Sequence, residues 1–211
     1  MNTGDTAFMM ICAALVFFMT PGLAFFYGGL VRRKNVCNTI MACVAIMGLS
    51  VVMWTLFGYS LSFGGNHAGI IGDFRWFGLN GVGMEAGPYA DSIPHLVFCA
   101  FQMMFAMITP ALITGSLVGR MKFKALFLFV AIWSVIVYYP MTHMVWGDGG
   151  FLAAIGSVDF AGGDVVHISS GISALVLAII LGRRRGYEHT TFRIHNIPSV
   201  VLGASLLWFG W

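Results

Sequence analysis

The sequence predicts an all-α protein, a polytopic bundle of transmembrane helices, on three observations. Hydrophobic residues make up 59% of the chain and charged residues only 9%, whereas a soluble domain carries roughly 25% charged residues. Long apolar runs recur along the chain, and a spanning helix needs about 20 such residues. Basic residues cluster in alternate connections between these runs. Such a chain has hydrocarbon rather than water as its main solvent.

Six apolar runs mark the expected helices. They cover about residues 7–31, 36–63, 93–118, 125–146 and 165–181, and a sixth starts at residue 197. The sixth run reaches only Trp211, which is short for a membrane span. We therefore expect residues 1–211 to be the N-terminal portion of one transmembrane domain, incomplete at the C-terminus.

The charges predict an orientation. Ten of the eleven lysines and arginines lie in the first, third and fifth connections, and Arg75 is the exception. The acidic residues lie mostly in the other connections, except Glu188. By the positive-inside rule the basic connections are cytoplasmic, so we expect a multi-pass protein of the cell membrane with its N-terminus outside. The basic residues are Arg32, Arg33 and Lys34; Arg120, Lys122 and Lys124; and Arg183, Arg184, Arg185 and Arg193.

Other features exclude some classes. The four cysteines show no metal-ligand spacing, so we expect free thiols. The net charge of +3 does not indicate a nucleic-acid partner. The connection of residues 64–93 is rich in glycine and carries Trp76 and Phe77, as in an extracytoplasmic loop with aromatic residues at the membrane interface.

His167 is the clearest candidate for function, because it lies in the fifth apolar run. Ionisable residues at membrane depth are costly and usually face a cavity or the bundle interior. One reading is a core histidine that bonds a neighbouring helix. The other is a buried imidazole that lines a pore, where the ring can both donate and accept hydrogen bonds.

Two aspartates precede His167. Asp164 lies three residues before it, so the two share a helix face in an α-helix, but Asp164 can equally be the N-cap, which we prefer. Asp159 can organise the preceding turn through backbone amides. It can also add negative potential at an outer vestibule. The structural role is the stronger expectation for Asp159.

Three aromatic residues and a glycine pair also stand out. Phe101 and Phe105 are four residues apart and share a helix face, as ordinary packing residues do. Trp146 ends the fourth run, where a belt anchor is typical. An aromatic face there also attracts a cation by roughly 0.5–2 kcal/mol. Gly115 and Gly119 have the GxxxG spacing of close helix packing, a weak signal.

Five strings together resemble the ammonium transporters (Amt/Mep/Rh superfamily, Amt branch) over essentially the whole chain. They are MTPGLAFFYGGLVRRKN, FQMMFAMITPALITGSLVGRMKF, YYPMTHMVWGDGG, DFAGGDVVHISSG and HNIPSVVLGASLLWFGW. The resemblance implies an eleven-helix fold, two inverted five-helix halves and a final helix, of which about six helices are present here with the sixth truncated. It also implies assembly as a homotrimer with one pore per subunit.

The resemblance also implies roles for single residues. Phe101, Trp146 and Asp159 correspond to the outer ammonium site, Phe105 to the pore gate, and His167 to the first of two pore histidines. Asp164 departs from the pattern, because other members often carry an uncharged residue such as threonine there.

The implied function is ammonium/ammonia transport across the lipid bilayer, without enzymatic activity, cofactor or metal. Ammonium is recruited at the outer aromatic site and deprotonated, and ammonia passes the pore histidine. A PII-type regulatory protein on the cytoplasmic face is a further implied partner.

Rival classes remain at this stage. An ammonium sensor would couple the same membrane domain to a cytoplasmic signalling module. A Rh-type gas channel fits less well, because of Trp146 and the string around His167. A membrane-embedded hydrolase is the weakest rival, since no Ser/His or HExxH constellation appears.

Overall fold

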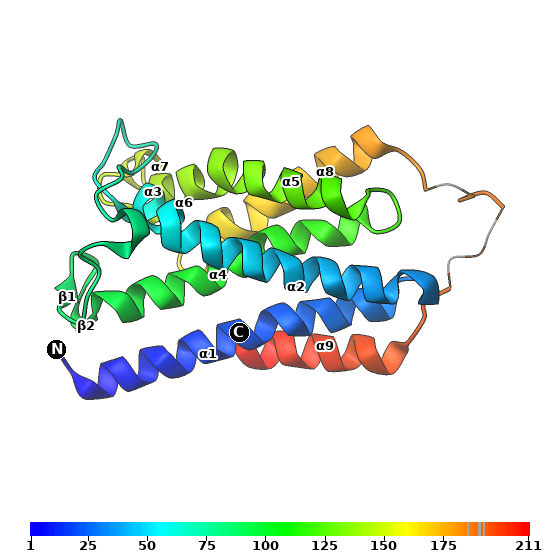
Figure 1. Ribbon diagram of the computed structural model, residues 1–211, viewed down its shortest axis with the longest axis horizontal. Helices are drawn as coiled ribbons and strands as arrows, with labels where there is room; N and C mark the ends of the chain where they lie inside the picture. Colours follow the sequence, from blue (N-terminus) through cyan, green and yellow to red (C-terminus); the bar gives the residue numbers. More distant parts are fainter. Residues whose placement is uncertain (185, 190, 192) are drawn as a thin grey trace.

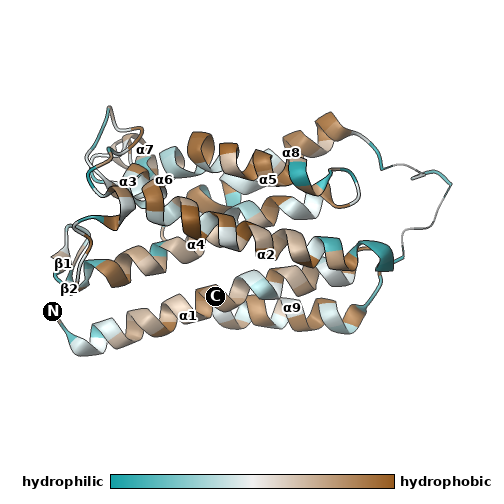
Figure 2. Cartoon of the chain, in the orientation of Figure 1, coloured by the Kyte–Doolittle hydropathy of each residue, from teal (hydrophilic) through white to brown (hydrophobic). Residues whose placement is uncertain are grey.

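The computed structural model describes residues 1–184, 186–189, 191 and 193–211. Long helices run side by side along its length, and the apolar residues concentrate along them (Figures 1 and 2). Five helical segments of this part are long and apolar enough to cross a membrane: Thr3–Leu30, Arg33–Phe63, His95–Leu117, Phe123–Ala154 and Gly163–Leu181. The chain is therefore a multi-pass membrane protein, as the hydropathy predicts. A shorter apolar helix, α9 (Ile197–Gly210), packs along α1 (Thr3–Leu30).

Three of the five segments are not continuous α-helices, which the sequence did not predict. A π-helical turn of five or six residues interrupts each of them, at Trp54–Gly58, Ser134–Tyr138 and Gly163–Ile168. The helices on either side are α2 (Val36–Met53) and α3 (Tyr59–Phe63), α5 (Phe123–Trp133) and α6 (Tyr139–Trp146), with α8 (Ser169–Leu181) after the third turn.

Aromatic packing accompanies the first two π-helical turns. The ring of Tyr139 lies 6.1 Å from those of both Trp54 and Phe57, measured between centroids. A π-turn inserts one residue into a helix and rotates everything after it, so side chains that a straight helix would present outward can meet a neighbour. Here it brings α3 and α6 together at the end of the bundle where the two helices finish.

The GxxxG prediction is half right. The helix α4 (His95–Leu117) passes Tyr27 so closely that a Cβ atom on Gly115 would lie 2.6 Å from the ring. Gly119 does not share that face, because α4 has already ended and Gly119 has a left-handed backbone with φ of 73°. The packing signal therefore belongs to Gly115 alone, and Gly119 serves the turn into α5.

The connection of residues 64–94 is more ordered than its glycine content suggests. It carries the short antiparallel strands β1 (Ala86–Gly87) and β2 (Ala90–Pro94) and the helical turn Phe77–Leu79. Ser92 at the hairpin accepts a hydrogen bond from the Asn2 amide, 2.7 Å, so the loop also holds the start of α1. The small helix α7 (Phe151–Ala154) lies at the same end of the molecule (Figure 1).

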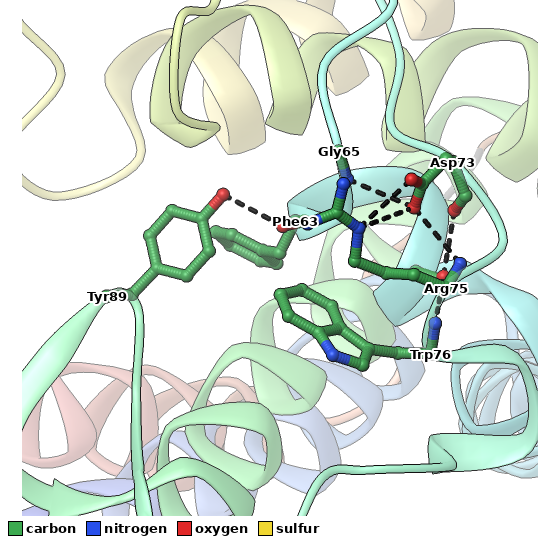
Figure 3. A network of polar contacts seen from close by, with 7 residues as sticks. Phe63, Gly65, Asp73, Arg75, Trp76 and Tyr89 are labelled. Atoms are coloured by element: carbon green, nitrogen blue, oxygen red, sulfur yellow. Dashed lines mark hydrogen bonds and ion pairs between the residues drawn. The ribbon is translucent and has the colours of Figure 1, made fainter.

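A polar network centred on Asp73 holds this connection together (Figure 3). The Asp73 carboxylate accepts hydrogen bonds from the amides of Gly65 and Arg75, both 3.0 Å, and pairs with the Arg75 guanidinium at 3.0 Å. Burial alone would raise the pKa of Asp73, but these hydrogen bonds outweigh it and hold the pKa below its usual value. Arg75, the exception to the charge alternation, is thus neutralised locally.

The three basic connections lie at one end of the bundle and the network around Asp73 at the other (Figure 1). The alternation of charge predicted from sequence is confirmed as an arrangement in space, apart from Arg185, which lies outside the described residues. Which end faces the cytoplasm stays a prediction. The four cysteines are free, as expected.

Candidate functional site

The start of the fifth spanning segment is built on one carboxylate. Oδ1 of Asp159 accepts hydrogen bonds from the amides of Gly162 and Gly163, at 2.6 and 2.8 Å. Oδ2 accepts from the amides of Asp164 and Val165, both 2.9 Å. These four donors lie at the beginning of the helix, where a negative charge is stabilised by the backbone dipoles. The structural role expected of Asp159 is confirmed.

Gly162 makes this arrangement possible. Its backbone is left-handed, with φ of 88°, and the π-helical turn begins directly after it. A residue with a Cβ atom disfavours that conformation, and here the Cβ would also lie 2.8 Å from the Val166 side chain. The tight reversal returns four consecutive amides to a carboxylate only a few residues upstream.

The preferred reading of Asp164 as the N-cap is wrong. Asp164 contributes its backbone amide to Asp159, and its own carboxylate accepts a hydrogen bond from the Ser157 hydroxyl, 2.6 Å. The expectation of a face shared with His167 assumed α-helical periodicity. The segment Gly163–Ile168 is π-helical, and a wider turn rotates side chains three residues apart away from one another.

The three predicted aromatic residues form one chain of edge-to-face contacts. The rings of Phe101 and Phe105 lie 5.1 Å apart at 83°, and those of Phe105 and Trp146 lie 6.2 Å apart at 69°. The indole N–H of Trp146 donates to the backbone oxygen of Asp159, 3.0 Å. Trp146 is therefore fixed by the turn that Asp159 organises, and all four predicted outer residues belong to one connected structure.

His167 lies between two cavities. The first, of 360 Å³, has an almost wholly apolar lining that includes Phe105, Ile108 and Trp211. The second, of 530 Å³, is lined by polar as well as apolar groups, among them Tyr27 and Ser116. The imidazole borders both, and its ring lies 5.7 Å from that of Trp211. A path from the aromatic chain to the second cavity therefore passes this histidine.

The expected burial of His167 is wrong for this chain by itself, in which the side chain is exposed. The face of α8 beyond it is exposed as well, with Ile172 and Leu175 each about 60% accessible. The cavities at His167 are thus open on one side among the described residues.

The serines after His167 stabilise the helix from within. Ser169 and Ser170 donate their hydroxyls to the carbonyl oxygens of Val165 and Val166, at 2.5 and 2.6 Å. Ser173 accepts a hydrogen bond from the Trp133 indole, 2.8 Å, which ties α8 to α5. A π-turn weakens the regular ladder of backbone hydrogen bonds, and these hydroxyls satisfy the carbonyls beside it.

Two buried histidines were missed from sequence. His143 is fully buried, with Nδ1 3.0 Å from the Ser62 carbonyl oxygen and Nε2 3.3 Å from the Asn66 side chain. His95 is 5% exposed, and its Nε2 lies 2.5 Å from the Tyr59 hydroxyl. His143 sits within an apolar run as His167 does, so the same signal could have found it. Its two partners make it a positioning group between α6 and the end of α3.

Comparison with known proteins gives a consistent result. A sequence profile described as the Ammonium Transporter Family matches residues 7–211. The "Ammonium transporter" of Bacillus subtilis (strain 168) is 50% identical over 211 residues, which cover 100% of this chain and 51% of the relative. "Ammonium transporter Amt1" of Archaeoglobus fulgidus is 44% identical, with coverage of 100% and 51%.

Solved structures agree with this. A crystal structure of a Candida albicans Mep2 mutant superimposes with a TM-score of 0.89 at 31% identity, covering 100% of this chain and 47% of that one. A structure described as "Sensor Amt Protein" gives a TM-score of 0.84 at 30% identity, covering 96% of this chain and 51% of that one. The chain thus spans about half the length of the relatives it matches. On sequence and fold together, the chain belongs to the Ammonium Transporter Family.

Proposed function

We propose that this chain supplies one side of a pathway for ammonium transport across a membrane. The observation that carries the proposal is the position of His167, which borders both the apolar cavity beneath Phe105 and the polar cavity beyond it. The names of the relatives, ammonium transporters at 50% and 44% identity, support the substrate.

In this proposal the outer site is formed by Phe101, Trp146 and Asp159. Aromatic ring faces attract a small cation by roughly 0.5–2 kcal/mol. The Asp159 carboxylate holds Trp146 in place and adds negative potential, which concentrates cations at the site. Ammonium can therefore exchange part of its water shell for ring faces before it enters the bundle.

The apolar cavity then selects the neutral species. Taking an ion out of water into an apolar medium costs several kcal/mol or more, and the cavity beneath Phe105 offers almost no polar surface. Ammonium loses one proton to water at the outer end, and ammonia passes Phe105, the gate. At His167 the imidazole accepts a hydrogen bond from ammonia or donates one to its lone pair.

The family also contains a sensor-type fold, shown by the similarity to the structure described as "Sensor Amt Protein". Ammonium sensing is therefore the second candidate. The transporter is preferred, because the similarity to named transporters reaches 50% identity against 30% for the sensor.

The assembly, orientation and partners are part of the same proposal. We infer a homotrimer in the cell membrane, with the N-terminus outside and the basic connections in the cytoplasm. A PII-type protein would then meet the end of the bundle that carries Arg32, Arg120 and Arg184.

A chimera tests the function directly. This chain, continued by the second half of the Bacillus subtilis relative, is placed in liposomes, and an ammonium gradient is imposed while the internal pH is followed. A transporter gives a flux that saturates with ammonium and exceeds that of empty liposomes. Saturable ammonium binding without flux would instead identify a sensor, and neither would remove both candidates.

A further inference from the structure

A groove at the basic end of the bundle gathers arginines that lie far apart in sequence. Its lining includes Arg32 from the α1–α2 connection and both Arg184 and Arg193 from the segment between α8 and α9. Asn35 and Gly119 complete its polar side. Leu30 and Val31, at the end of α1, supply an apolar edge, so the groove joins a charged floor to the membrane-spanning surface.

A fourth arginine, Arg120, holds this region in place. Its guanidinium Nη1 donates to the carbonyl oxygens of Gly182 and Ala178, at 2.9 and 3.3 Å, which are groups at the end of α8. A cation there compensates the negative end of the helix dipole. The α4–α5 connection is thereby fastened to the segment that carries Arg184, and the groove has a defined shape.

Like charges this close oppose one another. Burial, together with the neighbouring Arg120 and Arg32, lowers the pKa of Arg184 below its usual value. Arg32, Arg120 and Arg184 are each half-buried, so water screens their repulsion incompletely. The printed acidic side chain in this part of the sequence, Glu188, pairs with Arg183 on the surface rather than with these three. The region therefore holds an excess of positive charge that an anion would relieve.

From this convergence we propose that the groove between Arg32, Arg184 and Arg193 is a binding site for a phosphate group, either of an anionic lipid headgroup or of a soluble ion. Guanidinium groups match phosphate oxygens in planar, two-pronged geometry. Basic pockets between transmembrane helices are suited to anionic headgroups. The Leu30 and Val31 edge gives an acyl chain a place to lie.

The site also touches the transport path, because Arg184 lines both this groove and the 530 Å³ cavity that His167 borders. A bound phosphate group would offset positive potential at that end of the cavity. The proposal itself does not depend on transport, and binding can be measured without flux.

Binding is tested with the purified chain in nanodiscs at 0.15 M salt. One series contains phosphatidylcholine only and is titrated with inorganic phosphate, and another contains increasing phosphatidylglycerol. The readout is the midpoint of thermal unfolding and, for the lipid, the number of phosphatidylglycerol molecules retained in native mass spectrometry. Stabilisation by inorganic phosphate in the neutral discs assigns a soluble ion, and stabilisation by phosphatidylglycerol alone assigns the headgroup.

The decisive comparison uses two double variants with the same loss of charge. Arg32→Gln with Arg184→Gln removes the groove, whereas Lys122→Gln with Lys124→Gln removes two exposed charges at the same end. We expect about tenfold weaker binding for the first pair and less than about twofold for the second, because salt screens exposed charges.

Equal weakening in both pairs would overturn the proposal, since a diffuse basic surface would then explain the binding. So would the absence of saturable binding in the unsubstituted chain. Should the arginine pair fail to fold, Arg193→Gln serves instead, because Arg193 is exposed and carries no helix contact of its own to lose. It must weaken binding more than Lys124→Gln does.

Discussion

Two carboxylates at the same end of the molecule use their oxygens in similar ways, with different electrostatic outcomes. Asp73 accepts backbone amides and an arginine, so its charge is neutralised within its own loop. Asp159 accepts four backbone amides, and its printed partners include no cationic side chain among the described residues. The first pattern builds a loop. The second builds a turn and leaves a negative charge beside Trp146 and Phe105.

The difference explains why the two regions suit different tasks. A neutralised pair such as Asp73–Arg75 gives geometry without a field, which suits a cover over the helix ends. Peptide dipoles stabilise a carboxylate without cancelling its formal charge. A cation that approaches Trp146 still meets the net charge of Asp159. This contrast is what the following substitutions break or sharpen.

The largest effect is expected from Asp159→Ala. It strands four backbone donors and frees the Trp146 indole, so we expect a loss of about 3–6 kcal/mol in the free energy of unfolding, given roughly 1.5–3 kcal/mol per hydrogen bond to a charged group and incomplete additivity. Unfolding by a denaturing detergent in mixed micelles measures it. Asp91→Ala, an exposed aspartate on β2, is the control. Equal stability of the two variants would contradict the cap assigned to Asp159.

A middle-sized effect is expected from Trp146→Leu in the chimera with the Bacillus subtilis second half. Losing roughly 0.5–2 kcal/mol of cation–π attraction raises the ammonium concentration at half-maximal flux by about 2- to 30-fold. Phe77→Leu, an exposed aromatic residue of the outer loop, should leave it unchanged. A concentration dependence identical to that of the unsubstituted protein would argue against aromatic recognition.

The smallest effect concerns Asp73 and acid. Because its folded pKa is lowered, its contribution is fully present above the unfolded value of about 3.9 and is lost as the pH falls through the lower folded value. The pair is partly exposed, so we expect only about 1 kcal/mol. Thermal unfolding from pH 7 to pH 2.5 should show Asp73→Asn less stable at pH 7, with the difference vanishing in acid. A constant difference across that range would refute this account.

The sequence predicted the spanning segments well, because hydropathy depends on composition that every residue of a run shares. Their interruption at Trp54–Gly58 and Ser134–Tyr138 was not predictable in the same way. A π-turn there is stabilised by contacts such as Trp54 with Tyr139, 85 positions apart in the chain. No local pattern around Trp54 specifies that partner.

The site was predicted in part for the same reason. The residue types near His167 were identifiable, yet two aspartates competed for the start of the helix. Spacing favoured Asp164, but the left-handed backbone at Gly162 turns the amides toward Asp159 instead. The roles of Phe101, Phe105 and Trp146 in an ammonium site came from resemblance and stay predictions. Their mutual contact is a finding of the structure.

The central claim is that ammonia passes His167 between two cavities. The most direct measurement is ammonium-driven flux in liposomes that contain the chimera with His167→Ala, beside the unsubstituted chimera at equal protein density. The account predicts at least a tenfold loss of flux or a change of selectivity toward potassium, with insertion and thermal stability retained, because the exposed imidazole adds no printed hydrogen bond to the fold. Unchanged flux and unchanged selectivity in that variant would contradict it.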